Sequence, residues 1–170
     1  MRTPLYWIDG PWPGRLAIMP RPRGGDWLED EVLAWQRDGV GVLVSALTDE
    51  EASELDLVKE PELCGANRLE FVPFPVADRG VPESTRALDE LVRLLESRLA
   101  GGKNVAIHCR QGIGRSALIA ACVLSRGGVT PEAAFARIGK ARGAAVPDTT
   151  EQRDWVGRFA RDAVAAASKI

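Results

Sequence analysis

The sequence is poor in the side chains that bind metal ions. It has one histidine, His108, and three cysteines, Cys64, Cys109 and Cys122. A zinc site needs several such ligands, and the neighbourhood of His108 supplies only Cys109. We therefore expect no metal ion and no other cofactor. Three cysteines cannot all pair with one another, and this usage favours a reducing compartment.

Strong charge of one sign and long apolar segments are also missing. The chain has 22 Lys and Arg against 24 Asp and Glu, a formal net charge of −2, so its charge favours neither nucleic acid nor an anionic membrane surface as a partner. Residues 1–14 lack the apolar core of a signal peptide, and the longest apolar run, residues 117–124, is too short to cross a bilayer. We expect a soluble, cytoplasmic monomer.

A length of 170 residues suits one domain, and no internal repeat or low-complexity tract divides the chain. We expect a single domain over residues 1–170. Short apolar and β-branched runs predict strands at residues 15–19, 40–47, 69–74 and 105–107. Apolar residues at helical spacing predict helices over residues 26–35, 88–99 and 117–124, and three more helices that begin near Thr48, Thr130 and Asp148.

Local signals support several of these helices. Residues 26–29 resemble a capping box, residues 48–51 cap a short helix, and Thr130 precedes a proline and an acid typical of a first helical turn. The last helix gathers apolar residues on one face: Trp155, Val156, Phe159, Ala160, Ala163 and Val164. Because strands alternate with helices, the fold class is α/β, with a central, mostly parallel sheet flanked by helices.

The most informative segment is residues 105–116, VAIHCRQGIGRS, between a predicted strand and an apolar helix. Gly112 and Gly114 allow successive backbone N–H groups to converge on one point. The helix N-terminus adds further N–H donors and a partial positive charge. We therefore expect this loop to bind a phosphate group, with these residues around it: Arg110, Gln111, Gly112, Ile113, Gly114 and Arg115.

Cys109 and Arg115 bring reactive groups to this loop. The dipoles that attract an anion would also favour a thiolate at Cys109, and the guanidinium of Arg115 can hold two phosphoryl oxygens in a fork. The alternatives are a Cys109 that packs as a small hydrophobe and a loop that binds phosphate without reacting. For His108 we expect hydrogen bonds to neighbouring backbone that support the loop.

The pattern HCxxGxxR(S/T) at residues 108–116 resembles the signature of the dual-specificity and protein tyrosine phosphatase family. The resemblance implies a protein tyrosine phosphatase-like fold and hydrolysis of phosphate monoesters through a phosphocysteine intermediate. The implied substrate is a phosphorylated protein, with phosphotyrosine first and phosphoserine or phosphothreonine second. It also implies that the Ser116 hydroxyl helps the Cys109 sulfur to leave, whereas the alternative for Ser116 is a cap or back-bond within the helix.

The resemblance also implies a general acid, because the leaving oxygen needs a proton. Asp78 lies in the segment FPVADRGVP, residues 74–82, after a predicted strand and upstream of Cys109, where the family carries its acid loop. We predict that Asp78 is the acid, with Glu83 as a distant second choice. The alternative for Asp78 is an ordinary turn residue.

The resemblance further implies that Gln152, in the first turn of the last helix, orients the attacking water, because several family members carry a glutamine with this role in a comparable C-terminal segment. A surface position is the alternative for Gln152, and it stays open. Arg79, Arg142 and Arg153 either line the approach to the pocket or are solvated charges. Cys122 is expected in the core, and Cys64 in a loop, where no pattern supports a redox partnership with Cys109.

The subtype is narrowed by what the sequence does not share with related families. The acid precedes the cysteine loop, which excludes the low-molecular-weight phosphatases, and the sole tyrosine, Tyr6, lies outside any tyrosine-recognition loop. We therefore favour the shallow pocket of the dual-specificity type. Arg110 leaves an inositol phosphate or nucleotide open as substrate, although the loop has no lysine. A catalytically silent phospho-binding module is a further alternative.

Overall fold

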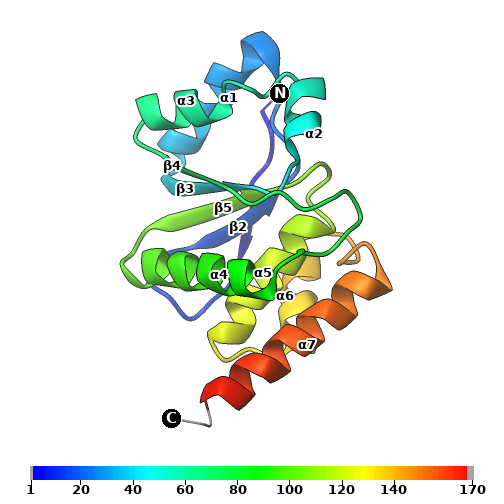
Figure 1. The fold of residues 1–170 in the computed structure, drawn as a ribbon. Coiled ribbons are helices and arrows are strands. Elements are labelled where there is room, and N and C mark those ends of the chain that lie inside the picture. The colour runs from blue at the N-terminus through cyan, green and yellow to red at the C-terminus, as the bar shows by residue number, and fades with distance from the viewer. Residues whose placement is uncertain (1, 168–170) are drawn as a thin grey trace.

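The structure, a computed structural model, describes residues 2–167 and is built on one five-stranded sheet with helices on both faces (Figure 1). The strand order is β1-β2-β5-β3-β4. Only the β1–β2 pair is antiparallel, and every other pair is parallel, so the predicted α/β class with a mostly parallel sheet is confirmed. The strands are β1 (Tyr6–Ile8), β2 (Leu16–Met19), β3 (Val40–Ser45), β4 (Glu70–Pro73) and β5 (Asn104–His108).

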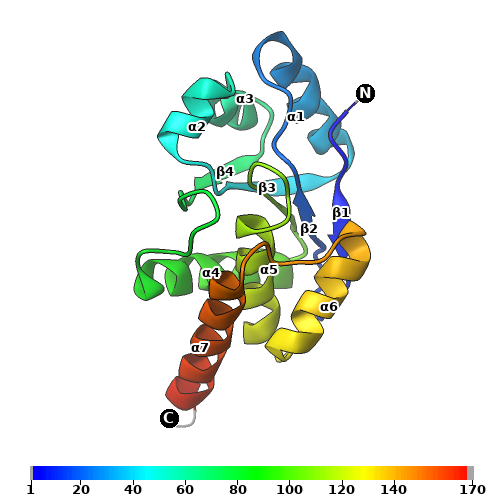
Figure 2. The same cartoon turned by 90° about the vertical axis from the view of Figure 1, so that its right-hand side faces the viewer.

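The helices form two layers that cover opposite faces of the sheet (Figures 1 and 2). One layer holds the shorter helices α1 (Leu28–Arg37), α2 (Asp49–Glu54) and α3 (Glu60–Ala66). The other layer holds the longer helices α4 (Thr85–Ala100), α5 (Arg115–Arg126), α6 (Pro131–Arg142) and α7 (Thr150–Ala167).

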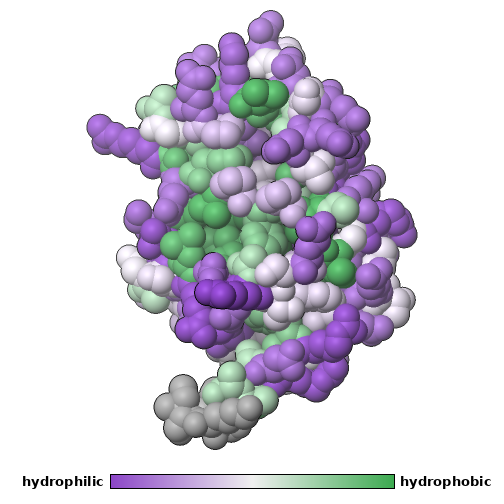
Figure 3. All heavy atoms as spheres, viewed as in Figure 1, coloured by the Kyte–Doolittle hydropathy of each residue, from purple (hydrophilic) through white to green (hydrophobic). Residues whose placement is uncertain are grey.

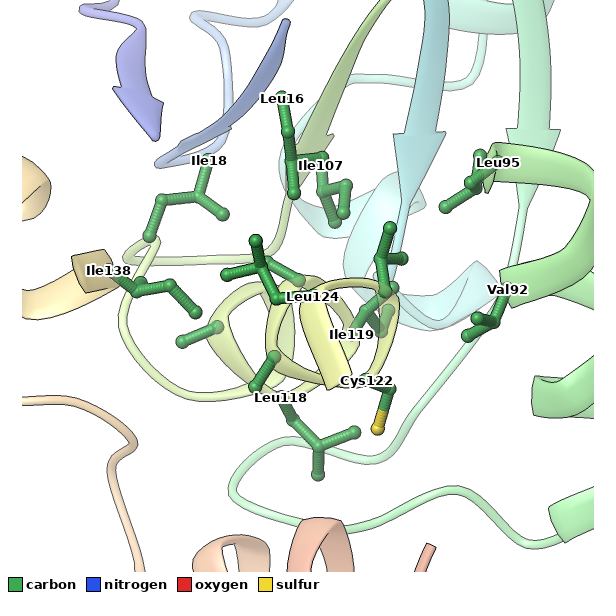
Figure 4. Close-up of a cluster of buried hydrophobic side chains, with 14 of the residues drawn as sticks. Leu16, Ile18, Val92, Leu95, Ile107, Leu118, Ile119, Cys122, Leu124 and Ile138 are labelled. Atoms are coloured by element: carbon green, nitrogen blue, oxygen red, sulfur yellow. The ribbon is translucent and has the colours of Figure 1, made fainter. Parts of the chain in front are cut away.

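Each face of the sheet has its own hydrophobic core, because side chains alternate along a strand. In β2, Leu16 and Ile18 face the α4–α7 layer, whereas Ala17 and Met19 face the α1–α3 layer. Figure 4 shows Ile107 of β5 among side chains of α5. Residues 115–124 of α5 are all buried, because the helix packs against the sheet, α4, α6 and α7.

The predicted elements are present, with two additions. The short strand β1 and the helix α3 were not predicted. The capping box expected at residues 26–29 is wrong, because neither Gly24 nor Trp27 makes a side-chain cap and a 3-10 turn (Gly25–Trp27) leads into α1 instead. The caps at Thr48 and Thr130 are confirmed, and the first is a full capping box with Glu51.

One further prediction about a single residue is wrong. Cys64 lies in α3 and is fully buried, not in a loop. On the predicted apolar face of α7, Trp155 and Phe159 are buried, whereas Val164 is 71% exposed because the last turns of α7 extend past the core.

The face of the molecule drawn in Figure 3 is mainly polar, with a hydrophobic area near the sheet edge. Figure 3 shows charged and polar side chains over the helices and a hydrophobic area beside β4, the edge strand. Phe71 and Val72 of β4 are partly buried. Across residues 2–167, no helix combines the length and the apolar character needed to span a membrane.

Candidate active site

The loop between β5 and α5 lies beyond the carboxyl ends of β2, β5 and β3, the position where open α/β sheets bind ligands. Gly112 adopts a φ of +70, and a Cβ there would lie 2.7 Å from the carbonyl carbon of Met19 and the nitrogen of Pro20. The loop is also tied to the segment after β2 by the Arg21 N–H, which donates to Arg110 O at 3.1 Å. Only glycine therefore fits at position 112 without moving this segment.

Cys109 lies at the base of the loop with polar groups directed at its sulfur. The N–H of Gly112 donates to Cys109 Sγ at 3.3 Å, and Ser116 Oγ lies 3.2 Å from the same sulfur. The first hydrogen bond of α5 runs from Leu118 N–H to Gly114 O, so the amides that precede it point from the helix end toward the loop. This arrangement favours a negative charge on Cys109 and gives Ser116 contact with the sulfur.

The other two cysteines lie in environments that suppress ionisation. Burial, together with the negative charge of Glu60, raises the pKa of Cys64 to about 12. Burial also raises the pKa of Cys122, which lies within α5 beside Leu118 and Ile119 (Figure 4). Cys64 and Cys109 belong to cores on opposite faces of the sheet, which disfavours a redox pair. Within residues 2–167, no three His, Cys, Asp or Glu side chains cluster as a metal site would require.

His108 supports the loop from beneath, and its principal partner was not foreseen. Its Nδ1 lies 3.4 Å from Cys109 O, the expected backbone contact, and its Nε2 lies 2.7 Å from Glu60 Oε1. Both side chains are buried. Glu60 is the first residue of α3, so this pair joins strand β5 to the α1–α3 layer of helices.

The guanidinium of Arg115 is held mainly by Glu51, which sequence reasoning missed. Nη1 and Nη2 donate to Glu51 Oε1 and Oε2 at 2.6 and 3.0 Å. Nη1 also donates to Val76 O at 2.9 Å, and Nη2 donates to Asp78 Oδ1 at 3.1 Å. Nε makes no hydrogen bond to any described residue. Glu51 occupies the Nη1–Nη2 edge of the guanidinium. The edge that can donate hydrogen bonds to phosphoryl oxygens is therefore the one formed by Nε and Nη2.

The contact between Glu51 and Arg115 shifts the pKa of both side chains. Burial alone would favour the neutral acid, but hydrogen bonds from Arg115, the Thr48 backbone and Arg110 lower the pKa of Glu51 to about 2. Burial likewise opposes the charge on Arg115, yet the contact with Glu51 and the charges of Cys109 and Asp78 raise its pKa. Both groups are therefore ionised throughout the neutral range, and Arg115 is fixed in place.

Asp78 lies on the loop after β4 and faces the same site. Its side chain is 61% exposed and bonds to Arg115 Nη2. Asp78 and Arg79 are the central residues of a turn closed by Gly80 N–H, which donates to Ala77 O at 2.8 Å, and Arg79 pairs with Asp148 at 3.3 Å. Glu83 is exposed and does not line the pocket. A pocket of about 90 Å³ joins these groups, lined by Asp78, Arg79, Cys109, Arg110, Gln111, Ile113, Gly114, Arg115, Asp148 and Gln152.

Gln152 lines this pocket and is fully buried, so the surface alternative is wrong. Its Oε1 accepts the N–H groups of Asp148 and Thr149 at 3.0 and 3.1 Å, which caps α7. Its Nε2 donates to Gly80 O at 3.0 Å. Gln152 therefore holds the Asp78 loop against the start of α7.

The remaining arginines have distinct partners. Arg110 bonds to Glu51 at 3.2 Å and to Glu54 at 3.4 Å, so its charge is balanced at the rim. Arg153 donates to Val146 O at 2.9 Å and does not line the pocket. Arg142 donates to carbonyl groups of the loop itself.

Comparison with known proteins gives related sequences. Residues 17–129 match the family described as "Polymorphic toxin system, DSP-PTPase phosphatase". Human cyclin-dependent kinase inhibitor 3 is 34% identical over 94 residues, which are 54% of this chain and 43% of that protein. The putative tyrosine phosphatase 197R of Invertebrate iridescent virus 6 is 28% identical over 141 residues, 79% of this chain and 50% of that protein. The matches thus span half or less of these relatives.

Solved structures share the fold at low sequence identity. The crystal structure of kinase associated phosphatase matches with a TM-score of 0.87 and 20% identity, over 97% of this chain and 98% of that chain. The crystal structure of PTPMT1 matches with a TM-score of 0.77 and 22% identity, over 98% and 99% of the two chains. These likenesses confirm the predicted phosphatase-like fold.

Proposed function

Since the chain belongs to the DSP-PTPase phosphatase family of polymorphic toxin systems, we propose that it hydrolyses phosphate monoesters of proteins through a phosphocysteine intermediate. One observation carries the proposal: Cys109, Arg115 and Asp78 line a single pocket. These three side chains supply the nucleophile, the anion-binding charge and the proton donor that the reaction requires.

In the first step, the Cys109 thiolate attacks the phosphorus atom opposite the leaving oxygen. A sulfur–phosphorus bond forms, the phosphorus–oxygen bond breaks, and the leaving oxygen takes a proton from the Asp78 carboxyl group. Loop N–H groups and the Nε–Nη2 edge of Arg115 hold the other phosphoryl oxygens. The doubly charged phosphoryl group of the substrate competes with Asp78 for the hydrogen bond from Arg115 Nη2. Substrate binding therefore frees the Asp78 side chain to approach the leaving oxygen.

In the second step, water attacks the phosphocysteine and the Asp78 carboxylate takes its proton. The sulfur leaves as a thiolate that the Ser116 hydroxyl, 3.2 Å away, can stabilise. Gln152 uses both lone pairs of its oxygen to cap α7 and one amide hydrogen to hold Gly80. Its second amide hydrogen is the group available to orient this water.

The pocket favours a phosphorylated side chain of a protein over a free small molecule. Its volume of about 90 Å³ is well below the roughly 300–1,000 Å³ of sites that enclose whole ligands. Arg110 is engaged by Glu51 and Glu54, which reduces the positive charge that an inositol phosphate or nucleotide would need. Phosphotyrosine is the first substrate we propose, and phosphoserine or phosphothreonine the second.

The test is a phosphate-release assay on phosphotyrosine, phosphoserine and phosphothreonine peptides and on an inositol phosphate. We expect turnover on the phosphotyrosine peptide and none with Cys109→Ser, because the loop cannot ionise a hydroxyl near neutral pH. Cys109→Ser should still bind tungstate through Arg115 and the loop amides. Cys122→Ala, in the buried helix α5 and away from the pocket, serves as the matched control and should keep its activity. Turnover in Cys109→Ser would contradict the mechanism.

A further inference from the structure

Arg142, the last residue of α6, donates hydrogen bonds to two backbone carbonyl groups on the outer side of the phosphate loop. Its Nε donates to Gly112 O at 3.1 Å and its Nη2 donates to Gln111 O at 3.1 Å. These are consecutive carbonyl groups, and one planar edge of the guanidinium binds both. A lysine could not reproduce this two-point contact, because its donors do not lie in a fixed plane.

Each of these carbonyls belongs to a peptide unit whose N–H points the other way. A peptide unit is planar and trans, so the orientation of its carbonyl fixes the orientation of its N–H. The unit that joins Gln111 to Gly112 donates its N–H to Cys109 Sγ at 3.3 Å, while its carbonyl accepts from Arg142. Arg142 therefore aims this N–H at the sulfur. A cation on the carbonyl also polarises the unit and strengthens its donor.

The loop needs such support because its own conformation is permissive. Gly112 has a φ of +70, and glycine loses the most conformational freedom on ordering. Gln111 is exposed, so its side chain does not anchor this peptide unit in the core, and only Gly112 packs against the segment after β2. The contact with Arg142 constrains the Gln111 side of the unit.

Arg142 is itself held in position by Tyr6. Its guanidinium carbon lies 4.5 Å from the centroid of the Tyr6 ring, a cation–π contact. Tyr6 belongs to β1, against which α6 packs. Gly143, in the left-handed conformation with a φ of 76, ends the helix directly after Arg142. Strand β1, the Tyr6 ring and the C-terminal end of α6 thus support the loop together.

We propose that Arg142, steadied by Tyr6, is a positioning residue of the phosphate loop that orients the inward N–H groups for the Cys109 thiolate and the phosphoryl oxygens. The expected effect of Arg142 on turnover rests on the proposed function. The orientation of the loop can be measured without turnover.

The test compares Arg142→Met with Arg137→Met. Arg137 lies on the same helix and donates to a backbone carbonyl, Asp9 O, at 3.3 Å, and it lines a different pocket from the one at the phosphate loop. Arg142→Met should weaken tungstate binding and slow iodoacetamide alkylation of Cys109 by roughly tenfold each, the effect of losing one or two net hydrogen bonds. Arg137→Met should change neither.

Graded variants separate positioning from general destabilisation. Arg142→Lys should recover only part of the loss, Tyr6→Phe should match the wild type, and Tyr6→Leu should resemble a mild Arg142 variant. If Arg142→Met keeps wild-type tungstate affinity and alkylation rate, the inference is wrong, whatever its turnover. If the wild type turns over no ester while these two effects appear, the proposed function fails and the positioning role stands.

Discussion

At the scale of single residues, the three cysteines differ in their surroundings and hence in their chemistry. Burial raises the pKa of Cys64 to about 12 and that of Cys122 well above its ordinary value, whereas Cys109 lines the pocket and accepts an N–H hydrogen bond. Only a thiolate reacts readily with alkylating reagents.

We therefore expect iodoacetamide to modify Cys109 alone in the native protein near neutral pH. Intact-mass and peptide analysis should find one adduct, and tungstate should protect against it. Cys64 and Cys122 should react only after unfolding in urea. Modification of Cys64 in the native state at a rate comparable to Cys109 would show that the helix α3 opens easily.

Asp78 allows a second residue-scale prediction. If it protonates the leaving oxygen, Asp78→Asn should slow hydrolysis of a phosphotyrosine peptide by roughly 10²- to 10⁴-fold. An activated aryl phosphate, whose phenol is already acidic, should slow much less. The comparison requires kcat/KM for both esters in the wild type, Asp78→Asn and the control Glu83→Gln, which alters a carboxyl group outside the pocket. Equal loss on both esters would reduce Asp78 to a turn residue that positions Arg115.

At the scale of elements, periodicity in the sequence predicts what depends on local pattern. The strands at β2 to β5, the long helix α4 and the buried helix α5 follow from apolar spacing. β1 has three residues in a proline- and glycine-rich region, and α3, with the sequence EPELCGA, has too few apolar residues to show a helical period. α3 does have a local start signal, a proline and two acids in its first turn, but without an apolar period this signal does not define a helix, and β1 depends on its pairing with β2.

The same division applies to the candidate site. The motif at residues 108–116 and the proline-bounded loop at Asp78 are local patterns, and sequence alone points to them. Glu51 and Glu60 are distant in sequence from Arg115 and His108, with which they pair, and no spacing rule connects them. The capping box at Thr48 does single out Glu51, but it explains only the helix end. Pairing across the sheet requires knowledge of the strand order.

At the scale of the whole molecule, the site joins the two helical layers through the carboxyl end of the sheet. Glu51 of α2 and Glu60 of α3 lie in one layer, while Arg115 opens α5 in the other. The buried Glu51–Arg115 ion pair therefore bridges the two layers behind the pocket, and the buried hydrogen bond between Glu60 and His108 ties α3 to the central strand β5. Breaking one partner of such a pair leaves an uncompensated buried charge, so loss of the site should also lower the stability of the fold.

The pH dependence of unfolding tests this link between site and stability. The pKa of Glu51 is about 2 in the folded protein, below its ordinary value of 4.5, so its stabilising effect is complete above about pH 4.5 and is lost as the pH falls toward 2. Urea unfolding should show Glu51→Gln less stable than the wild type at pH 7, by at most about 3 kcal/mol. That gap should narrow by up to about 2 kcal/mol between pH 5 and pH 3. The control is Glu54→Gln, whose exposed carboxylate pairs with Arg110 and with no other residue of the described part of the chain, and which should track the wild type throughout. A gap for Glu51→Gln that stays constant with pH would mean that the carboxylate charge does not hold the two layers together.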